Sequence, residues 1–433
     1  MSTLRPAGPE TVPERDSGRR RGFAAITPIA RLFAPEHRDS VLLICTTLFL
    51  VGFGLVMVLS ASSVEEEASS GDPFGRVARQ ALFAAIGVPL MLVFSRMPAR
   101  FWKRWAVVML AVIGVLQLAV FIPGLSYSYG GNQNWIAFGS FSMQPSEFLK
   151  FALIIWIGLV LGRRQGQLDD WRMLALPVAP VAGLGILLVL AGNDLGTATI
   201  LLLIVFGCAY FAGARLWHLT VAGLGIALAA VLFAMTSTSR VERIAAWMRG
   251  CHPDDPSYLL FCWQPQHGLW ALASGGVLGA GLGKSRSKWS WLPEADSDYI
   301  FAIIGEELGL IGSLVVLILF LILALTFVRM MRRTRDPFAR IVTGGVFVWV
   351  IGQAFVNIAV VLGLLPVLGV PLPLISAGGS SLIAVLAAIG VVVSVNRERP
   401  VDPSLASMAV PGTTAPAAPR GARAQRGRPG AVR

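Results

Sequence analysis

The sequence predicts an all-α integral membrane protein, and three observations carry that prediction. Of 433 residues, 55% are hydrophobic and only 14% are charged, whereas soluble domains carry about 25% charged residues. The mean hydropathy is +0.69. Apolar runs of about 20 residues, long enough for a helix to cross a bilayer, recur along the chain. The net charge of +12 indicates membrane topology rather than nucleic acid as a partner, because Arg and Lys cluster between these runs and in the tails.

Ten apolar segments are expected to cross the membrane as helices. They cover residues 41–61, 80–95, 105–122, 147–162, 174–192, 197–213, 216–236, 299–328, 341–362 and 382–395. The second and last are short, so their ends are approximate. The sequence thus predicts a bundle of about ten transmembrane helices over residues 41–399, with a large external loop at 237–298.

The distribution of positive charge predicts the orientation of these helices. Four short loops, at 96–104, 163–173, 214–215 and 329–340, hold 13 of the 36 Lys and Arg residues and should be cytoplasmic. Loop 123–146 has neither residue type and should be external. An even number of spans leaves both tails, residues 1–40 and 400–433, in the cytoplasm. Their polar, Pro- and Arg-containing composition predicts disorder.

One apolar segment is not expected to form a helix. Residues 363–381 contain three prolines and several glycines, and proline removes backbone hydrogen bonds and clashes with the preceding turn. Non-helical backbone at membrane depth persists only when it is buried in protein or lines a wet cavity. We therefore expect this segment to lie beside a cavity near the outer surface.

Acidic residues cluster around the start of the span at 299–328. Glu294, Asp296 and Asp298 lie at its outer mouth, and Glu306 and Glu307 lie inside it. Acids within a membrane are costly and are functional candidates by default. The alternative is structural: Asp298 would cap the helix, and the glutamates would pair with buried Lys or Arg.

Other polar residues have equally open roles. Lys284, Lys288 and Arg243 in the large external loop suit a phosphate-bearing substrate, or they belong to a solvated loop. Glu147 and Lys150 are spaced for a local ion pair at the start of the fourth span. Asp194 is either a turn residue or part of an outer cavity.

The four cysteines divide into two kinds. Cys45 and Cys208 lie in apolar spans and should pack as small hydrophobic side chains. Cys251 and Cys262 share the large loop, which the topology places on the oxidising side. A disulfide between them would enclose ten residues and stabilise the loop by roughly 2–3 kcal/mol. The alternative is two free thiols.

Four stretches, in this order, resemble the SEDS family (shape, elongation, division and sporulation) of membrane-embedded peptidoglycan polymerases. They are NWIAFGSFSMQPSEFLK at 134–150, NDLGTA at 193–198, SGGVLGAGLGKSRSKWSWLPEADSDYIFAIIGEELG at 274–309 and NIAVVLGLLPVLGVPLPLISAGGSSL at 357–382. Together they sample the chain from about residue 41 to residue 399. The approach to LPEA resembles the cell-division branch of the family more than the elongation branch.

The resemblance implies a glycosyltransferase that polymerises lipid II at the outer face of the bacterial cytoplasmic membrane, at the division septum. The family's catalytic aspartate falls on Asp298, which would act as the base. The candidate substrate-binding residues are Trp135, Glu147, Lys150, Asp194, Arg243, Gln264, Lys284, Lys288 and Ser376. Lys284, Lys288 and Arg243 would serve the diphosphate, alone or with a divalent cation (Mg²⁺ or Mn²⁺). The implied partners are a class B penicillin-binding transpeptidase and other division proteins.

The chain departs from the family pattern at several positions. Asp296 and Ser297 replace His and Thr in the motif LPEAHTD, so two nearby acids compete for the catalytic role. Asn134 stands where the family often has Arg, and Gly192-Asn193 stands where it has Gln-Pro. Roles that depend on the arginine are therefore not expected here.

Two other functions remain open at this point. A transporter that flips lipid II across the membrane would also use intramembrane acids such as Glu306. A non-catalytic scaffold would only recruit a transpeptidase.

Overall fold

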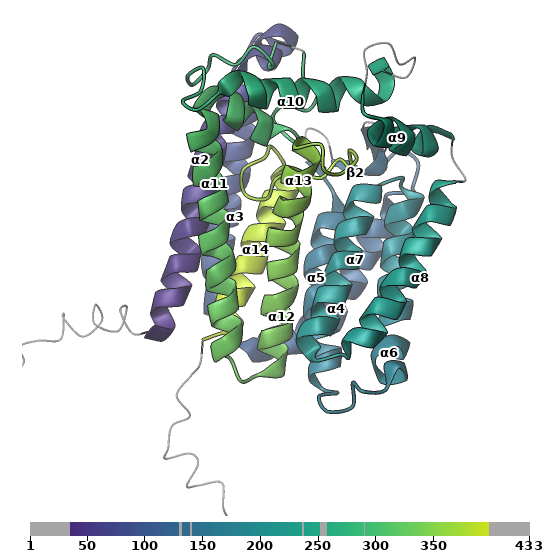
Figure 1. Ribbon diagram of the computed structural model, residues 1–433. Helices are drawn as coiled ribbons and strands as arrows, with labels where there is room; N and C mark the ends of the chain where they lie inside the picture. Colours follow the sequence, from purple (N-terminus) through teal and green to yellow (C-terminus); the bar gives the residue numbers. More distant parts are fainter. Residues whose placement is uncertain are drawn as a thin grey trace, which may run out of the picture. The chain divides into compact units, whose positions relative to one another are not determined.

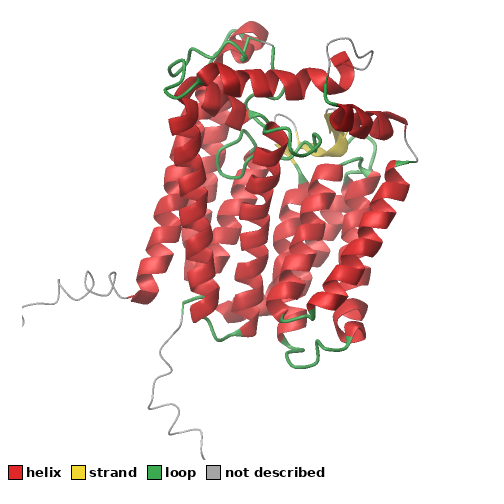
Figure 2. Cartoon of the chain, in the orientation of Figure 1, coloured by secondary structure: helices red, strands yellow, loops and turns green. Residues whose placement is uncertain are grey.

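The computed structural model describes residues 35–129, 132–138, 141–235, 238–251, 258–289 and 291–397. Helices dominate these residues (Figures 1 and 2). Most of the two predicted tails, 1–40 and 400–433, lies outside the described residues. The first helix, α2 (Pro35–Ser70), is longer than the predicted span 41–61 at both ends. It includes the end of the predicted tail before the span and the acidic residues after it.

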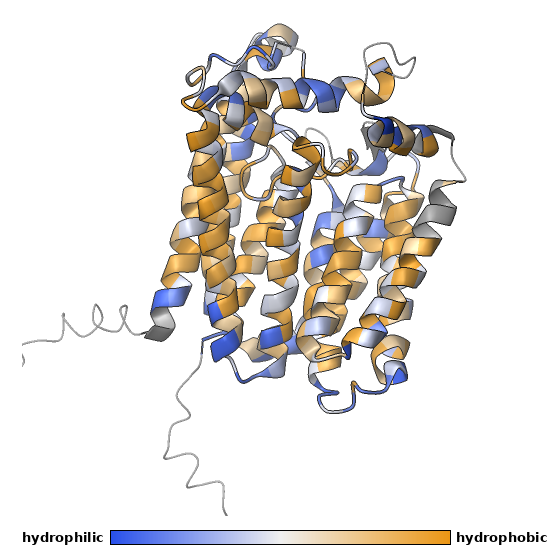
Figure 3. Cartoon of the chain, viewed as in Figure 1, coloured by the Kyte–Doolittle hydropathy of each residue, from blue (hydrophilic) through white to orange (hydrophobic). Residues whose placement is uncertain are grey.

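Among the described residues, eight helical segments are long and apolar enough to cross a membrane. They are α2, α3 (Gly75–Arg96), α4 (Ala99–Ala119), α5 (Pro145–Gly162), α6 (Trp171–Ala191), α7 (Leu195–Ala212), α11 (Ile300–Arg333) and the continuous α12 (Pro337–Phe347), η2 (Val348–Gly352) and α13 (Gln353–Val361). Two further apolar helices, α8 (Leu216–Ala234) and α14 (Gly379–Val395), occupy the other two predicted positions. Apolar residues follow the helices, and hydrophilic residues gather at the loops (Figure 3). The predicted α-helical membrane fold is confirmed.

Helices α5 and α14 form the buried centre of the bundle. Nearly every residue of both is buried; α5 packs against α4, α7 and α12, and α14 packs against α3. Small residues permit the close approach, as in many membrane helix pairs. At Gly390, for example, an added Cβ would lie 2.5 Å from the backbone oxygen of Met91.

The two long loops that were predicted to be external, 123–146 and 237–298, contain secondary structure that was not predicted from the sequence. Within loop 123–146, three antiparallel strands pair in the order β1 (Ser126–Tyr129), β2 (Asn132–Phe138) and β3 (Phe141–Met143). The large loop contains α9 (Thr238–Arg249), η1 (Tyr258–Cys262) and α10 (Trp263–Gly275). In Figure 1, α10 lies across the end of the bundle, where β2 and α9 are also found.

Helix α11 occupies the predicted span at 299–328 but is broken near its start, a detail that was not predicted. Gly309 has φ 68° and ψ −163°, a conformation that glycine adopts readily. Residues 276–281 fill the break: Leu310 N donates to Gly276 O (2.9 Å), and Ala280 N donates to Glu306 O (2.9 Å). The backbone groups freed by the break are thus satisfied within the protein, as membrane depth requires.

Candidate active site

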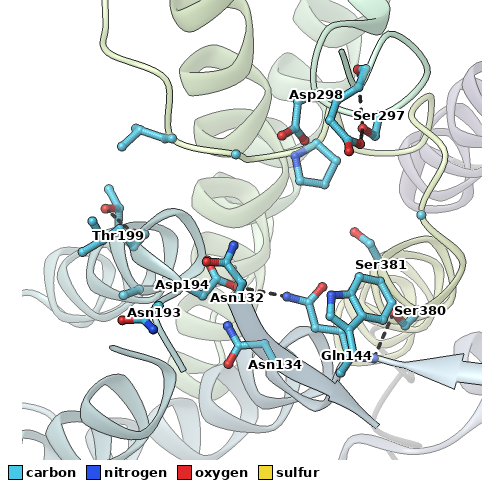
Figure 4. Close-up of a pocket in the computed structure, with 18 of the residues that line it drawn as sticks. Asn132, Asn134, Gln144, Asn193, Asp194, Thr199, Ser297, Asp298, Ser380 and Ser381 are labelled. Carbon is cyan, nitrogen blue, oxygen red and sulfur yellow. Dashed lines mark hydrogen bonds between the residues drawn. The ribbon is translucent and has the colours of Figure 1, made fainter. Parts of the chain in front are cut away.

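A cavity of about 1710 Å³ opens at the end of the bundle that carries the sheet, α9 and α10. Drug-sized ligands occupy about 300–1,000 Å³, so this cavity suits a larger substrate. Its lining is apolar where α3, α6, α7 and α8 contribute Leu82, Ile186, Leu202 and Ile226. It is polar near residues 294–298 and along the sheet (Figure 4).

Asp298 lines this cavity just before α11 begins. Tyr299 occupies the N-cap position without a side-chain hydrogen bond, so Asp298 is not the helix cap that the structural alternative required. Within the described part of the chain, no donor hydrogen-bonds to its carboxylate. Burial, and then the negative charges of Glu294, Asp194 and Asp296, raise the pKa of Asp298 to about 7. A carboxylate poised near neutrality is well suited to accept a proton.

Asp296, the competing acid, is engaged in an ion pair. Its Oδ2 lies 2.7 Å from Nη1 of Arg76, which comes from α3. Nε of Arg76 also lies 3.2 Å from Glu66 at the end of α2. Burial raises the pKa of Asp296, while the charge of Arg76 opposes this shift. The carboxylate of Asp296 is therefore held by the Arg76 ion pair, whereas the carboxylate of Asp298 faces the cavity without such a partner among the described residues.

The non-helical segment 363–378 is joined to the Asp298 motif through backbone carbonyl groups. Asn357 Nδ2, on α13, donates to Asp298 O (2.7 Å) and to Val370 O (2.8 Å). Ser376 Oγ donates to Ser297 O (2.5 Å) and accepts from Leu372 N. Ser376 does not line the cavity. It fixes the backbone next to Asp298, which differs from the substrate-binding role predicted for it.

Glu147 and Lys150 form a buried ion pair below the cavity. Lys150 Nζ lies 2.8 Å from Glu147 Oε1 and also donates to Gln353 Oε1 at 3.2 Å. The ammonium lies over the ring of Trp349. Neither member of the pair lines the cavity, so the structure favours the ion-pair alternative over direct substrate contact.

The structure places Lys284 and Lys288 away from the cavity. Lys288 is 6% exposed, lies 3.7 Å from Glu307 Oε1 and donates to Gly283 O at 2.7 Å. Lys284 is exposed. The prediction that these lysines contact the diphosphate is therefore not supported. Lys284 lies outside the cavity lining, and the ammonium of Lys288 is occupied by Glu307 and by Gly283 O.

The intramembrane glutamates are satisfied by the same loop. Glu306 accepts hydrogen bonds from Ser285 Oγ (2.6 Å) and Arg286 N (2.8 Å). Glu307 accepts a hydrogen bond from Ser60 Oγ (2.6 Å) in addition to the Lys288 contact. Both acids therefore attach loop 283–288 to α11. Only Glu307 pairs with a lysine, as the structural alternative proposes, whereas Glu306 accepts from a hydroxyl and a backbone N–H.

Three arginines supply positive charge to the cavity lining: Arg243 from α9, and Arg76 and Arg79 from α3. Arg243 was predicted. The other two were missed, because they lie between the predicted spans 41–61 and 80–95, an interval into which α2 and α3 extend. Arg79 lies 3.1 Å from Glu66 Oε1 and is largely exposed. Cationic side chains thus reach the cavity, but from helices other than the predicted loop.

The remaining predicted residues also line the cavity: Trp135 from β2, Asp194 and Gln264. Asp194 caps α7 by accepting from Thr197 N (2.8 Å), and its other oxygen accepts from Gln144 Nε2 (3.1 Å). Burial raises the pKa of Asp194, and the Thr197 N–H opposes that shift. Gln264 donates to Pro293 O (3.1 Å) and so braces the approach to the motif.

Cys251 and Cys262 form a disulfide with Cα atoms 5.3 Å apart. The bond joins the end of α9 to the start of α10. Arg243 on α9 and Gln264 on α10 both line the cavity. The disulfide therefore ties together two elements of the cavity rim.

The comparison with known families gives a direct assignment. Residues 40–400 match the model of the FtsW, RodA and SpoVE proteins, described as "cell cycle protein". The chain belongs to this family. The predicted resemblance to the SEDS proteins is thereby confirmed.

Several members of the FtsW/RodA/SpoVE family are similar over most of the chain. The probable peptidoglycan glycosyltransferase FtsW of Mycobacterium tuberculosis is 38% identical over 360 residues, which cover 83% of this chain and 68% of that protein. Stage V sporulation protein E of Bacillus subtilis is 36% identical over 356 residues, 82% of this chain and 96% of that protein.

Solved structures share the fold. RodA of Thermus thermophilus has a TM-score of 0.60 and 25% identity, covering 83% of this chain and 97% of that one. A chain from a structure titled "Structural coordination of polymerization and crosslinking by a peptidoglycan synthase complex" has a TM-score of 0.68 and 24% identity, covering 83% and 98%.

Proposed function

We propose that this protein is a peptidoglycan glycosyltransferase that polymerises lipid II during cell division. The observation that carries the proposal is Asp298, a carboxylate with a pKa of about 7, free of ion-pair partners among the described residues and facing a large cavity. The names of the FtsW relatives, at 35–38% identity, support both the reaction and the division role.

The geometry suits glycosyl transfer with Asp298 as the general base. Asp298 accepts the proton of the acceptor's 4-hydroxyl, whose oxygen forms a bond to the anomeric carbon of the donor. The bond between that carbon and the diphosphate oxygen breaks, and undecaprenyl diphosphate leaves. Negative charge grows on the leaving group, and Arg243, Arg76 and Arg79 line the same cavity to oppose it.

The apolar part of the lining suits the lipid portion of the substrate. Leu187 and Leu202 belong to α6 and α7, which are apolar enough to lie in the membrane. A chain held there would bring its sugars to the polar end of the cavity. The donor is already activated as a diphosphate, so no nucleotide site is required.

A divalent cation is compatible with the acids that line the cavity. Mg²⁺ is commonly held by one or two carboxylates together with substrate phosphates, and the carboxylates that line the cavity are those of Asp194, Glu294, Asp296 and Asp298. Such an ion would supply charge neutralisation at the diphosphate. The described residues contain no group of three or more His, Cys, Asp or Glu side chains gathered to bind a metal by themselves.

We further propose that the cavity faces outward at the division septum, that both tails are cytoplasmic, and that a class B penicillin-binding transpeptidase is the partner. The end of the bundle opposite α10 has hydrophilic loops (Figure 3), and the Arg-containing loops 163–173 and 329–340, which join α5 to α6 and α11 to α12, lie at that end (Figure 1), consistent with the positive-inside rule. The similar synthase complex, whose title couples polymerization to crosslinking, supports the partner.

The transporter alternative loses its main motive in this structure. It relied on intramembrane acids, but Glu306 and Glu307 are both bonded to loop 283–288. Polymerisation is therefore the function that the geometry supports best.

The test is purified protein, reconstituted with its transpeptidase and given fluorescent lipid II. We expect glycan polymer from the wild type and a loss of at least about 100-fold in Asp298→Asn, the size of typical general-base effects. Asp296→Asn is the matched control and should retain most activity. Full polymer yield from Asp298→Asn would refute the assignment, and loss confined to Asp296→Asn would move the base two residues upstream.

A further inference from the structure

Four carboxamide side chains line one side of the cavity: Asn132 and Asn134 from β2, Gln144 before α5, and Asn193 in the turn between α6 and α7. Figure 4 shows them together, across the cavity from Asp298 and Ser297. We call these four residues the carboxamide wall. They come from three separate segments, so only the fold brings them together.

Asn134 is the most unusual member of the wall. Its side chain is 0% exposed, and among the described residues neither Nδ2 nor Oδ1 has a hydrogen-bond partner. By contrast, Gln144 is engaged with Asp194. An unpaired buried amide is costly, and a ligand, an ion or a water molecule can supply the partner that the protein does not. Asn134 is therefore a candidate for a group that finds its partner in a ligand.

Gly192 makes room for this side chain. A Cβ added to Gly192 would lie 2.0 Å from Asn134 Oδ1, so any other residue there would displace the amide. Asn193 next to it has φ 64°, which proline cannot adopt because its ring fixes φ near −65°. The departures from the family pattern at positions 134, 192 and 193 are thus one coupled local structure beside the cavity.

The chemistry of the wall differs from that of the arginines. A carboxamide is neutral and offers both donors and acceptors, which match the hydroxyl and acetamido groups of a sugar. Arginine complements phosphate and carboxylate oxygens instead. Placing Asn at position 134, where the family often has Arg, removes a positive charge from this side of the cavity.

We propose that the carboxamide wall is a subsite for the uncharged sugar portion of the substrate, with Asn134 as its anchoring residue. The diphosphate lies toward the arginines, and the sugar lies between the wall and Asp298. This proposal rests on the function proposed above, because it assigns one part of the lipid II molecule to one side of the same cavity.

The test compares two ligands on purified full-length protein. Lipid II carries lipid, diphosphate, sugars and peptide, whereas undecaprenyl diphosphate carries only the first two. Asn134→Leu should weaken lipid II binding roughly tenfold, the scale of one lost hydrogen bond, and leave undecaprenyl diphosphate binding unchanged. Gln117→Leu on α4 is the matched control, since Gln117 is also a buried, unpartnered amide but does not line the cavity. It should change neither affinity.

A second variant separates the subsite from the loss of one side chain. Gly192→Ala keeps the Asn134 amide but displaces it, so it should reproduce the selective loss of lipid II affinity. Unchanged lipid II affinity in both variants, or equal loss for both ligands, would overturn the subsite while leaving the proposed reaction intact. Failure of the wild type to bind lipid II would overturn the proposed reaction and the subsite together.

Discussion

Two acids separated by one residue have different roles because they meet different neighbours. Asp296 faces Arg76 at 2.7 Å and has its backbone oxygen bonded to Ala377 N. Asp298 faces the cavity, and its nearest charged neighbours are other acids, which raise its pKa. The motif sequence leaves the choice between them open, and the ion pair of Asp296 with Arg76 on α3 favours Asp298 as the proposed base.

The first residue-scale prediction is the pH dependence of Asp298. With a pKa of about 7, a general base must lose activity as pH falls through that value. The polymerisation rate should drop about tenfold per pH unit below about pH 6.5 and level off above pH 8. Rates measured between pH 5.5 and 9 check this, and a flat profile down to pH 5.5 would contradict it.

The same pKa has a consequence for stability. Since the native pKa lies above the unfolded value of about 3.9, the native state binds the proton more tightly, and the free energy of unfolding should fall as pH rises from about 4 to 7. Asp298→Asn should remove this contribution and melt at a higher temperature than the wild type at pH 8. Equal melting temperatures at pH 8 would count against a buried charge at this site.

The second residue-scale prediction concerns the ion pair. Arg76→Gln leaves Asp296, 3% exposed at its side chain, without its partner and should lower the free energy of unfolding by about 3–5 kcal/mol. Adding Asp296→Asn should restore much of it. Arg79→Gln is the control, because Arg79 is 64% exposed and exposed pairs contribute about 1 kcal/mol or less. Thermal unfolding in detergent measures all three, and equal losses at Arg76 and Arg79 would refute a structural role for the pair.

At the scale of elements, the break in α11 and loop 276–288 form one unit. The loop donates backbone hydrogen bonds into the break at Gly309, and its polar groups satisfy Glu306 and Glu307. This unit holds the start of α11, immediately after Asp298, in a fixed position. Acids that look functional in the sequence are thus part of the support.

The prediction at this scale contrasts two lysines of the loop. Lys288→Gln removes the charge beside buried Glu307 and should lower the melting temperature, with little change in the KM for lipid II. Lys284→Gln, in an exposed residue, should change neither quantity. A concentration series of lipid II and a melting curve for each variant decide the matter. A selective rise in KM for Lys284→Gln would return this lysine to the binding site.

At the scale of the whole molecule, the cavity is closed by segments far apart in the chain. Many parts of the chain contribute lining residues, among them α3 with its arginines, the sheet, the turn that precedes α7, then α9, α10 and segment 366–381. The Cys251–Cys262 disulfide ties two of these segments together. The rim therefore depends on a covalent bond that persists only on an oxidising side of the membrane.

The disulfide provides the prediction at this scale, and it also tests the external orientation of the cavity. In protein isolated from membranes without reductant and then unfolded in denaturant, Cys251 and Cys262 should be protected from alkylation until reduction, whereas the free Cys45 and Cys208 should react without it. Reduction should destabilise the loop by roughly 2–3 kcal/mol. Mass spectrometry of non-reduced, alkylated peptides measures the pairing, and alkylation of both cysteines before reduction would refute it.

The sequence by itself determined the fold class and the order of the helices. Apolar runs the length of a bilayer leave few alternatives, since in lipid the backbone must satisfy its own hydrogen bonds. The prolines of segment 363–381 predicted non-helical backbone, which is correct for residues 363–378, whereas residues 379–381 form the start of α14. These properties are local, so composition and spacing along the chain contain them.

Only the tertiary structure decided which polar side chains share the cavity. Lys288 belongs to the same family-like stretch as Asp298, and Ser376 belongs to another such stretch. Neither lines the cavity: Lys288 pairs with Glu307, and Ser376 donates to the backbone oxygen of Ser297. Arg76 and Asn134 lie far from Asp298 in sequence, yet both line its cavity. The sheet and the helices of the large loop were likewise not foreseen. Such contacts depend on how distant segments pack and on which partner lies beside each charge. In a low-dielectric interior a charged group without a partner is costly, so the packing that supplies a partner determines its role.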